Sequence, residues 1–274
     1  LYYGIKAVAN MVANTDGDVA ALWEGSNEEH SALSKQLVDE VRSGMPILGE
    51  MTPGQTFNMR GVQYRYLENK GGGNHLVNTI EPQFNSQWNI NPATDNYNDS
   101  TLDNAMKNWH DNLPSVIRRQ VQPVQQEFTG VGPDAHISEN WFTTNSDWPS
   151  GWIPVVGTPH AFILDFEHPA FTAALKNDFA EVDSNGEKKA FALSVAEVNH
   201  LSGPGKAFPT MASRVIGQTR TPFTATHPWF VIPGGASTGS FMVINHWNTI
   251  NTAVWGQRPA LILRDQDGAW TSNI

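Results

Sequence analysis

The chain lacks cysteine and has few charged side chains, and each shortage narrows the functions open to it. Without cysteine there are no disulfides, no thiolate metal ligands and no cysteine nucleophile. Charged residues make up only 16% of the chain, and the acidic ones outnumber the basic ones, for a formal charge of −10. Nucleic acid phosphates and anionic membrane surfaces repel such a chain, so we expect neither as a main partner.

Long apolar runs are missing as well. No stretch approaches the ~20 apolar residues that a membrane-spanning helix needs, so we expect no membrane insertion. The sequence begins at Leu1 without a basic and apolar leader, which predicts a fragment or a processed product.

Aromatic residues, glycine and proline are plentiful instead. The 274 residues include 10 Trp, 13 Phe, 23 Gly and 17 Pro. This composition is typical of short strands joined by many turns, with aromatic side chains packed between them. A chain of this length can bury a sizeable core, and because helical patterns accompany the strands we predict an α+β fold.

Residues 1–45 have a helical pattern of their own. Apolar side chains recur on alternating three- and four-residue steps from Ile5 to Leu22. Ser26 precedes Glu29 at the capping-box spacing, which predicts the start of a second helix. The pattern fits a helical hairpin packed on its own domain or an oligomerising stalk. We favour a stalk over residues 1–45 and one domain over residues 46–274, and we expect a homo-oligomer, most simply a trimer.

From residue 46 onward short β-prone runs alternate with a few helical ones. Gly71 to Asn74 separate two β-prone runs, as a hairpin loop does. A long loop is expected over 84–100 and a turn over 183–186. Strands are expected at 55–60, 61–68, 75–80, 161–166, 190–194, 229–232, 240–245 and 258–263, and helices at 101–112, 114–122 and 171–179.

One enzyme motif matches in sequence but lacks the secondary structure that the motif requires. Residues 235–239 match the G-x-S-x-G nucleophile elbow, which needs a strand before it and a helix after it. Strand-like runs lie on both sides here, and no histidine follows His246. We therefore interpret these residues as a hairpin loop.

Metal motifs are equally incomplete. His160 and His168 stand eight residues apart without the helix of an H-E-x-x-H site. Asp183 and Asp265 lie in runs that resemble the opening of a calcium loop, yet neither run continues to the closing glutamate, so both are predicted to be turns. We expect no metal and no cofactor.

A polar and aromatic segment near the carboxyl end is the strongest candidate for binding. Asn, His and Trp residues crowd together at 245–251 between two predicted strands. Amides and imidazoles hydrogen-bond to hydroxyl and peptide groups, and an indole offers a flat apolar face. An alternative is a polar loop with one core tryptophan. The candidate ligand-binding residues are Asn245, His246, Trp247, Asn248, Asn251, Trp255, Ser237, Thr238 and Trp148.

Several short motifs, in order, resemble an uncharacterised domain family of phage tail and bacterial surface proteins. The Phe-x-Leu-Ser-x-x-Glu pattern at 191–197 matches a strand-to-helix element of that family. Arg-Pro-Ala-Leu at 258–261 matches its closing strand. Further matches lie at 97–102, 109, 121–124 and 229–234.

This resemblance covers about residues 46–264 and implies a fold related to C-type lectins and formylglycine-generating enzymes. It implies short twisted antiparallel sheets, two or more helices, and a closing strand after a variable loop region. Phe230 stands where the family has a second tryptophan, and Val231 and Ile232 replace its Leu-Arg-Ser. With no cysteine, the resemblance implies no formylglycine-generating chemistry.

The function implied is non-enzymatic recognition in a phage tail tip or fibre, in a virion or at a cell surface. The 237–256 segment, with the outer part of 141–152, would contact a host surface glycan or protein. One alternative is a structural virion or surface-array protein that meets other virion or surface proteins. Another is a wall-degrading hydrolase that uses Asp165 and Glu167, which alternate along one expected strand.

Overall fold

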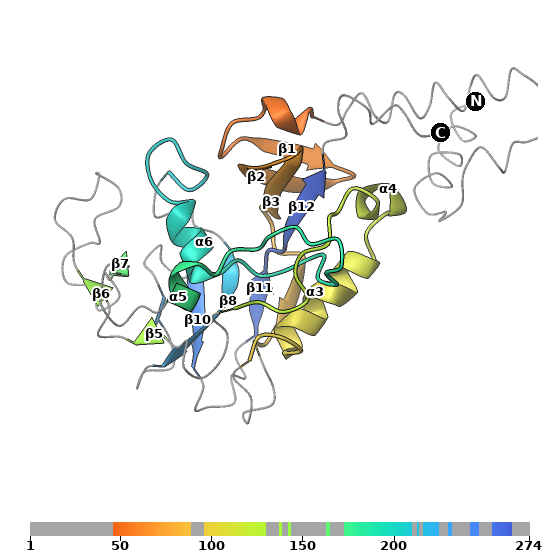
Figure 1. The fold of residues 1–274 in the computed structure, drawn as a ribbon. Coiled ribbons are helices and arrows are strands. Elements are labelled where there is room, and N and C mark those ends of the chain that lie inside the picture. Colours follow the sequence, from red (N-terminus) through yellow and green to blue (C-terminus); the bar gives the residue numbers. More distant parts are fainter. Residues whose placement is uncertain are drawn as a thin grey trace, which may run out of the picture.

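A computed structural model shows a mixed α+β protein with small sheets and few helices (Figure 1). The structure describes residues 46–88, 96–129, 173–209, 213, 216–224, 230–231, 242–246 and 254–264, together with three strand pairs of residues at 137–138, 142–143 and 163–164. The stalk expected over residues 1–45 lies outside the described residues, and both it and the domain boundary stay predictions.

The first sheet has four strands in the order β1-β2-β3-β12, all antiparallel. Its hairpin turns through Gly72 and Gly73, whose φ angles of 60° and 74° suit glycine. The expected strands and hairpin loop are confirmed. The strands span Thr56–Met59 (β1), Val62–Gly71 (β2), Asn74–Thr79 (β3) and Ala260–Arg264 (β12).

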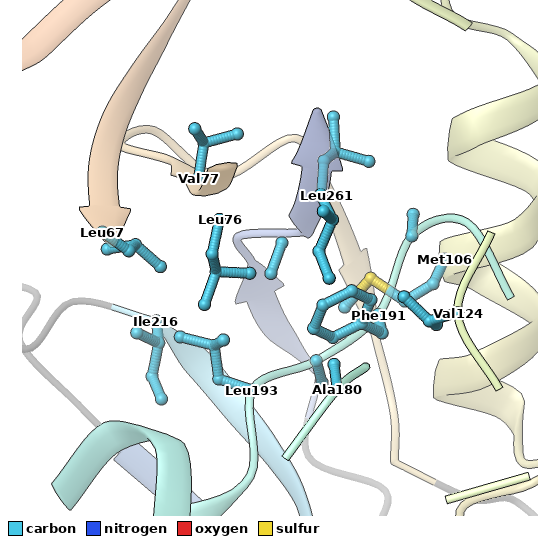
Figure 2. Close-up of a cluster of buried hydrophobic side chains, with 14 of the residues drawn as sticks. Leu67, Leu76, Val77, Met106, Val124, Ala180, Phe191, Leu193, Ile216 and Leu261 are labelled. Atoms are coloured by element: carbon cyan, nitrogen blue, oxygen red, sulfur yellow. The ribbon is translucent and has the colours of Figure 1, made fainter. Parts of the chain in front are cut away.

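The inner strand β3 and the edge strand β12 of this sheet are buried on both faces. Every residue of β3 from His75 to Thr79 is buried, and Ala260 to Leu263 of β12 are 0% exposed. A strand covered on both faces shows a continuous apolar run rather than an alternation. The core continues from these strands to Phe191, Leu193 and Ile216 (Figure 2).

The second sheet also has four strands, in the order β5-β8-β10-β9. The pairs of β8 with β10 and with β5 are parallel, so the expectation of purely antiparallel sheets is wrong for this sheet. The strands span Ile137–Ser138 (β5), Gly217–Thr224 (β8), Phe230–Val231 (β9) and Met242–His246 (β10).

Two small antiparallel ribbons complete the described strands. One pairs β4 with β11, and β4 falls inside the loop expected over 84–100, which is a further correction. Three paired residues supply too short a pattern to read from sequence. The strands span Phe84–Ser86 (β4), Trp255–Gln257 (β11), Phe142–Thr143 (β6) and Ile163–Leu164 (β7).

The best-formed helix is α3, Thr101–Asp111, as expected. It begins where the Ser100 side chain accepts the backbone N–H of Asp103, and it buries Leu102 and Met106. The remaining helical elements of the described residues are short: Leu48–Glu50 (η1, a 3-10 turn), Ser115–Arg118 (α4), Ala173–Lys176 (α5) and Val195–His200 (α6).

The run over 190–194 is not a regular strand. It meets β12 at one bridge, between Phe191 and Ala260, and then enters α6. The turn over 183–186 is confirmed, because the Gly186 N–H donates to the Asp183 carbonyl and the Asn185 N–H to the Asp183 side chain. Among the described residues no helix has the length and apolar character to cross a bilayer.

Candidate functional site

Only part of the predicted binding set falls within the described residues. Asn245 and His246 end β10, where they face Pro222 and Phe223 of β8. Trp255 begins β11 opposite Ser86 of β4. Six predicted residues lie outside the described residues: Trp148, Ser237, Thr238, Trp247, Asn248 and Asn251.

The strands that flank 247–254 both reach Gln218 on β8. On one side Val243 of β10 pairs with Gln218 in the parallel ladder. On the other side Gln257 of β11 exchanges bonds with Gln218: the Gln218 backbone N–H donates to Gln257 Oε1 at 3.1 Å, and Gln257 Nε2 donates to Gln218 Oε1 at 2.7 Å. Both glutamine side chains are at most 1% exposed. The strands before and after 247–254 are therefore both joined to β8 at the buried pair Gln218 and Gln257.

Close backbone packing accompanies this amide pair. Gly217 has φ +81°, and a Cβ there would lie 2.7 Å from the Gly256 carbonyl oxygen and 2.8 Å from Gln257 Oε1. No larger residue fits this approach of β8 to β11. One residue before β11, Val254 is 58% exposed, so the chain enters this strand from the surface.

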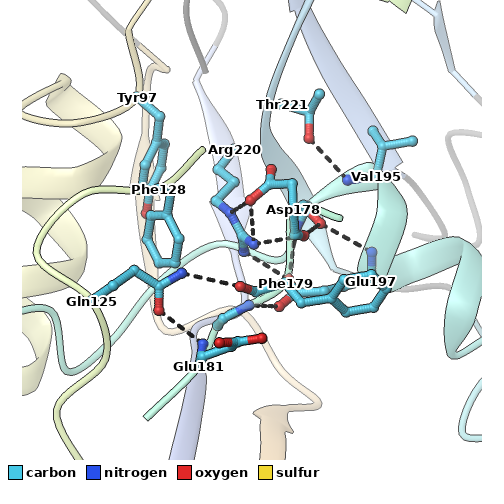
Figure 3. Close-up of polar contacts among 12 residues, drawn as sticks. Tyr97, Gln125, Phe128, Asp178, Phe179, Glu181, Val195, Glu197, Arg220 and Thr221 are labelled. Atoms are coloured by element: carbon cyan, nitrogen blue, oxygen red, sulfur yellow. Dashed lines mark hydrogen bonds and ion pairs between the residues drawn. The ribbon is translucent and has the colours of Figure 1, made fainter. Parts of the chain in front are cut away.

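Two residues beyond Gln218, the Arg220 side chain is fully buried between two carboxylates (Figure 3). Its Nε and Nη2 donate to Asp178 Oδ1 at 3.1 and 2.8 Å, and its Nη1 donates to Glu197 Oε2 at 2.7 Å. The two remaining N–H groups donate to the carbonyls of Ala192 and Asp178. All five guanidinium donors are used. We call Arg220, Asp178 and Glu197 the Arg220 cluster.

Glu197 also caps the start of helix α6, Val195–His200. Its Oε2 accepts the Ser194 N–H at 2.8 Å while the Ser194 hydroxyl accepts the Glu197 N–H at 3.0 Å, which completes a capping box. Its Oε1 accepts the Ala180 N–H at 2.7 Å. One carboxylate therefore joins β8, α6 and the segment after Asp178.

The cluster contains one more negative than positive charge, and burial makes that excess costly. Burial, reinforced by the Glu197 carboxylate, raises the pKa of Asp178 to about 6, against the opposing pull of Arg220. Burial alone would lower the pKa of Arg220, yet the two carboxylates hold it above its ordinary value. The pKa of Asp178 is thus raised even though its carboxylate accepts two bonds from the guanidinium.

Aromatic rings cover the guanidinium. Its carbon lies 4.1 Å from the centre of the Phe128 ring. A row of rings runs on from there, with centres 5.8 Å apart for Phe128 and Tyr97 and 6.4 Å apart for Tyr97 and Trp88. The Trp88 indole donates to the Thr219 carbonyl at 2.9 Å, which fixes β8 again next to Arg220.

A second buried ion pair lies near the same rings, with Lys188 Nζ 5.6 Å from the centre of Phe128 and 5.7 Å from that of Tyr97. Lys188 Nζ is 2.6 Å from Asp103 Oδ2, and Lys107 approaches the same oxygen at 3.3 Å. Lys188 and Asp103 are 3% and 0% exposed. This pair joins α3 to the segment before 190, and among the described residues neither side chain bonds to β8.

These carboxylates have structural partners and are sealed from solvent. At 1% exposure, neither Asp178 nor Glu197 has surface through which a substrate could reach it. The pair Asp165 and Glu167, and the histidines His160 and His168, lie outside the described residues. In the described part of the chain no three His, Asp or Glu side chains gather in a group that could hold a metal ion.

Sequence reasoning singled out Glu197 within a motif but missed its partners Asp178 and Arg220. The spacing of Ser194 and Glu197 is a readable capping signal. Arg220 lies in a threonine-rich run without apolar alternation, so nothing in the pattern marks it as buried.

The flanks of the G-x-S-x-G motif agree with the loop interpretation. β9 ends at Val231, β10 begins at Met242, and the two pair antiparallel. A nucleophile elbow would instead be followed by a helix. Comparison of the chain with family models, with curated proteins and with solved structures gives no match.

Proposed function

We propose that this chain is a non-enzymatic recognition module with a C-type-lectin-like fold, which binds a host surface glycan or protein from a phage tail tip or fibre. The proposal places the contact face on the 237–256 segment with the outer part of 141–152. The observation that carries it is the anchoring of both strands that flank 247–254 at the buried pair Gln218 and Gln257.

Such anchoring matters because binding by a loose segment costs ordering entropy. A segment whose two ends are held by paired strands leaves fewer conformations to lose, so its side chains bind with less penalty. The amide and indole groups of Trp247, Asn248 and Asn251 lie in the stretch between those ends. These groups suit the hydroxyls and flat faces of sugars, and also peptide groups.

The direct test replaces Trp247 and Asn248 with alanine and measures binding to intact bacteria and to purified wall polysaccharide. We expect at least about tenfold weaker binding, since losing a stacking ring and an amide contact costs more than 1.4 kcal/mol. Asn185→Ala is the matched control, because Asn185 is exposed on the 183–186 turn, outside the proposed contact segments. Unchanged binding by a folded double variant would remove this segment from the site.

The mass of the chain in solution tests the stalk. If residues 1–45 associate, light scattering gives a multiple of 30.2 kDa, with a trimer as the expected species, and removal of 1–45 returns the monomer. Linked copies act at about millimolar effective concentration, so association would strengthen attachment. A monomer in the presence of residues 1–45 counts against the stalk.

A zymogram against bacterial walls tests the opposite function. The recognition proposal expects no clearing. Clearing that Asp165→Asn abolishes would replace it with a hydrolase.

A further inference from the structure

The strand β8 changes partners at its centre, and the change coincides with Arg220. In the ladder with β10, Val243 pairs with Gln218 and Asn245 pairs with Pro222, so β10 advances two positions while β8 advances four. The residues between, 219–221, bulge out of that ladder. Pro222 has no N–H to give to the ladder, which favours an interruption at this point.

The bulged residues bond instead to the segment that leads into helix α6. The Arg220 N–H donates to the Leu193 carbonyl at 3.1 Å, and the Val195 N–H donates to the Thr221 hydroxyl at 3.0 Å. The Arg220 side chain points into the core to Asp178 and Glu197, as Figure 3 shows. Residues 219–221 of β8 are thus bonded to residues 193–195 at the position where their pairing with β10 is interrupted.

Apart from β8, which Gln257 and Trp88 also hold, the described strands of the second sheet are short or weakly paired. Its outer strands β5 and β9 have two residues each, and its central pair is parallel, which is slightly weaker per residue than an antiparallel pair. Asn245 and His246 resume pairing with β8 at Pro222 and Phe223, directly after the bulge. The position of their backbone therefore depends on where residues 219–221 are fixed.

We infer that Arg220 is a positioning residue: by tying the bulge of β8 to Asp178 and Glu197, it sets the register of β10 and the place of Asn245 and His246. The inference deepens the proposed function and rests on it for the role in binding. The register itself needs no ligand and can be measured alone.

Hydrogen exchange on the full chain tests the inference. Arg220→Met alone would leave two buried carboxylates without their cation. The test variant therefore combines it with Asp178→Asn and Glu197→Gln, which leaves the cluster neutral and keeps an acceptor for the α6 cap. We expect peptides covering 217–224 and 242–246 to exchange about tenfold faster or more, because charge-assisted bonds are lost there. Peptides covering 74–79 and 260–264 should keep their protection.

The matched control removes the other buried ion pair with Lys188→Met and Asp103→Asn. That pair is also buried but does not bond to the described residues of β8, so 217–224 and 242–246 should stay protected. Equal loosening in the control would overturn the inference. Unchanged exchange in the triple variant, or a loss spread evenly over 74–79 and 260–264, would overturn it as well.

Binding of the same variants to wall polysaccharide separates the two claims. With both correct, the triple variant binds about tenfold less tightly than the native chain and the control binds normally. If exchange changes as expected while the native chain and the Trp247 and Asn248 variant bind alike, the positioning role stands and the proposed site falls. Normal binding by a triple variant with a loosened β10 would overturn the role in binding.

Discussion

The two four-stranded sheets of this protein are stabilised by different forces. In the first sheet, antiparallel strands up to ten residues long bury apolar side chains such as Leu76 and Leu261. In the second sheet, β8 carries buried Gln218, Thr219, Arg220 and Thr221 and is fixed by amide and ionic bonds. Apolar burial tolerates small shifts, whereas directional polar bonds fix one register.

This contrast indicates that the first sheet provides stability, while the polar bonds of the second sheet fix the position of β8. The apolar sheet supplies most of the free energy of folding, because burial contributes roughly 25 cal/mol per Å² of apolar surface. The polar bonds of β8 add specificity more than net stability, since desolvation offsets much of their attraction. Substitutions in each sheet separate the two contributions.

Arg220→Met is expected to produce the largest loss. It leaves Asp178 and Glu197 buried without their cation, which costs about 3–5 kcal/mol of unfolding free energy. Urea unfolding followed by circular dichroism measures the loss. The exposed Arg264→Met serves as control and should change the value by less than about 0.5 kcal/mol. A similar small effect at Arg220 would mean that the buried charges have no structural role.

Leu261→Ala tests the apolar sheet by the same measurement. Leu261 is 0% exposed on β12 and pairs with Val77, so truncation should cost about 2–5 kcal/mol through lost burial and a cavity. Exposed Val254→Ala is the control, with an expected change under about 0.5 kcal/mol. Unlike the Arg220 loss, the loss at Leu261 should not diminish when Asp178 and Glu197 are also neutralised.

The same contrast explains what the sequence could predict. Strands β1, β2, β3 and β12 and helix α3 follow from apolar patterning, glycine turns and a serine cap, since those features act locally. β8 was missed because its buried side chains are polar and its partners Asp178 and Glu197 lie 42 and 23 positions away along the chain. No local pattern encodes such partners.

The candidate site divides in the same way. Chemistry picked out Asn245, His246 and Trp255 as binding residues, and that choice stays a prediction. Their support by Gln218 and Gln257 could not be read from the sequence, because a buried glutamine and an exposed one look alike there. Burial is decided by tertiary pairing, here a parallel ladder between β8 and β10.

The pH dependence of stability tests the charge excess of the Arg220 cluster. The pKa of Asp178 is about 6 in the fold, against an ordinary value near 4 when unfolded. Between these values the folded state binds a proton that the unfolded state releases, so its contribution is fully present below pH ~4. That contribution is lost as pH rises through 6, and we expect a difference of roughly 2–3 kcal/mol.

Thermal unfolding from pH 4 to pH 7, compared between the native chain and Asp178→Asn, isolates this contribution from that of other carboxylates. In the Asp178→Asn variant this decrease in stability with rising pH should be absent. Asp183→Asn, in the 183–186 turn, should follow the native curve. Parallel curves for the native chain and Asp178→Asn would show that the cluster carries no excess charge.

Ser194→Ala is expected to have the smallest effect. It removes the hydroxyl that accepts the Glu197 N–H and donates to the Asp178 carbonyl, and it leaves Glu197 bound to Arg220, so the helix start weakens while the ion pairs remain. The loss should be about 1 kcal/mol, the usual cost of removing a helix cap. Exposed Ser184→Ala should be neutral in the same urea titration. A loss at Ser194 as large as that of Arg220→Met would mean that the cap, rather than the guanidinium, holds β8 against α6.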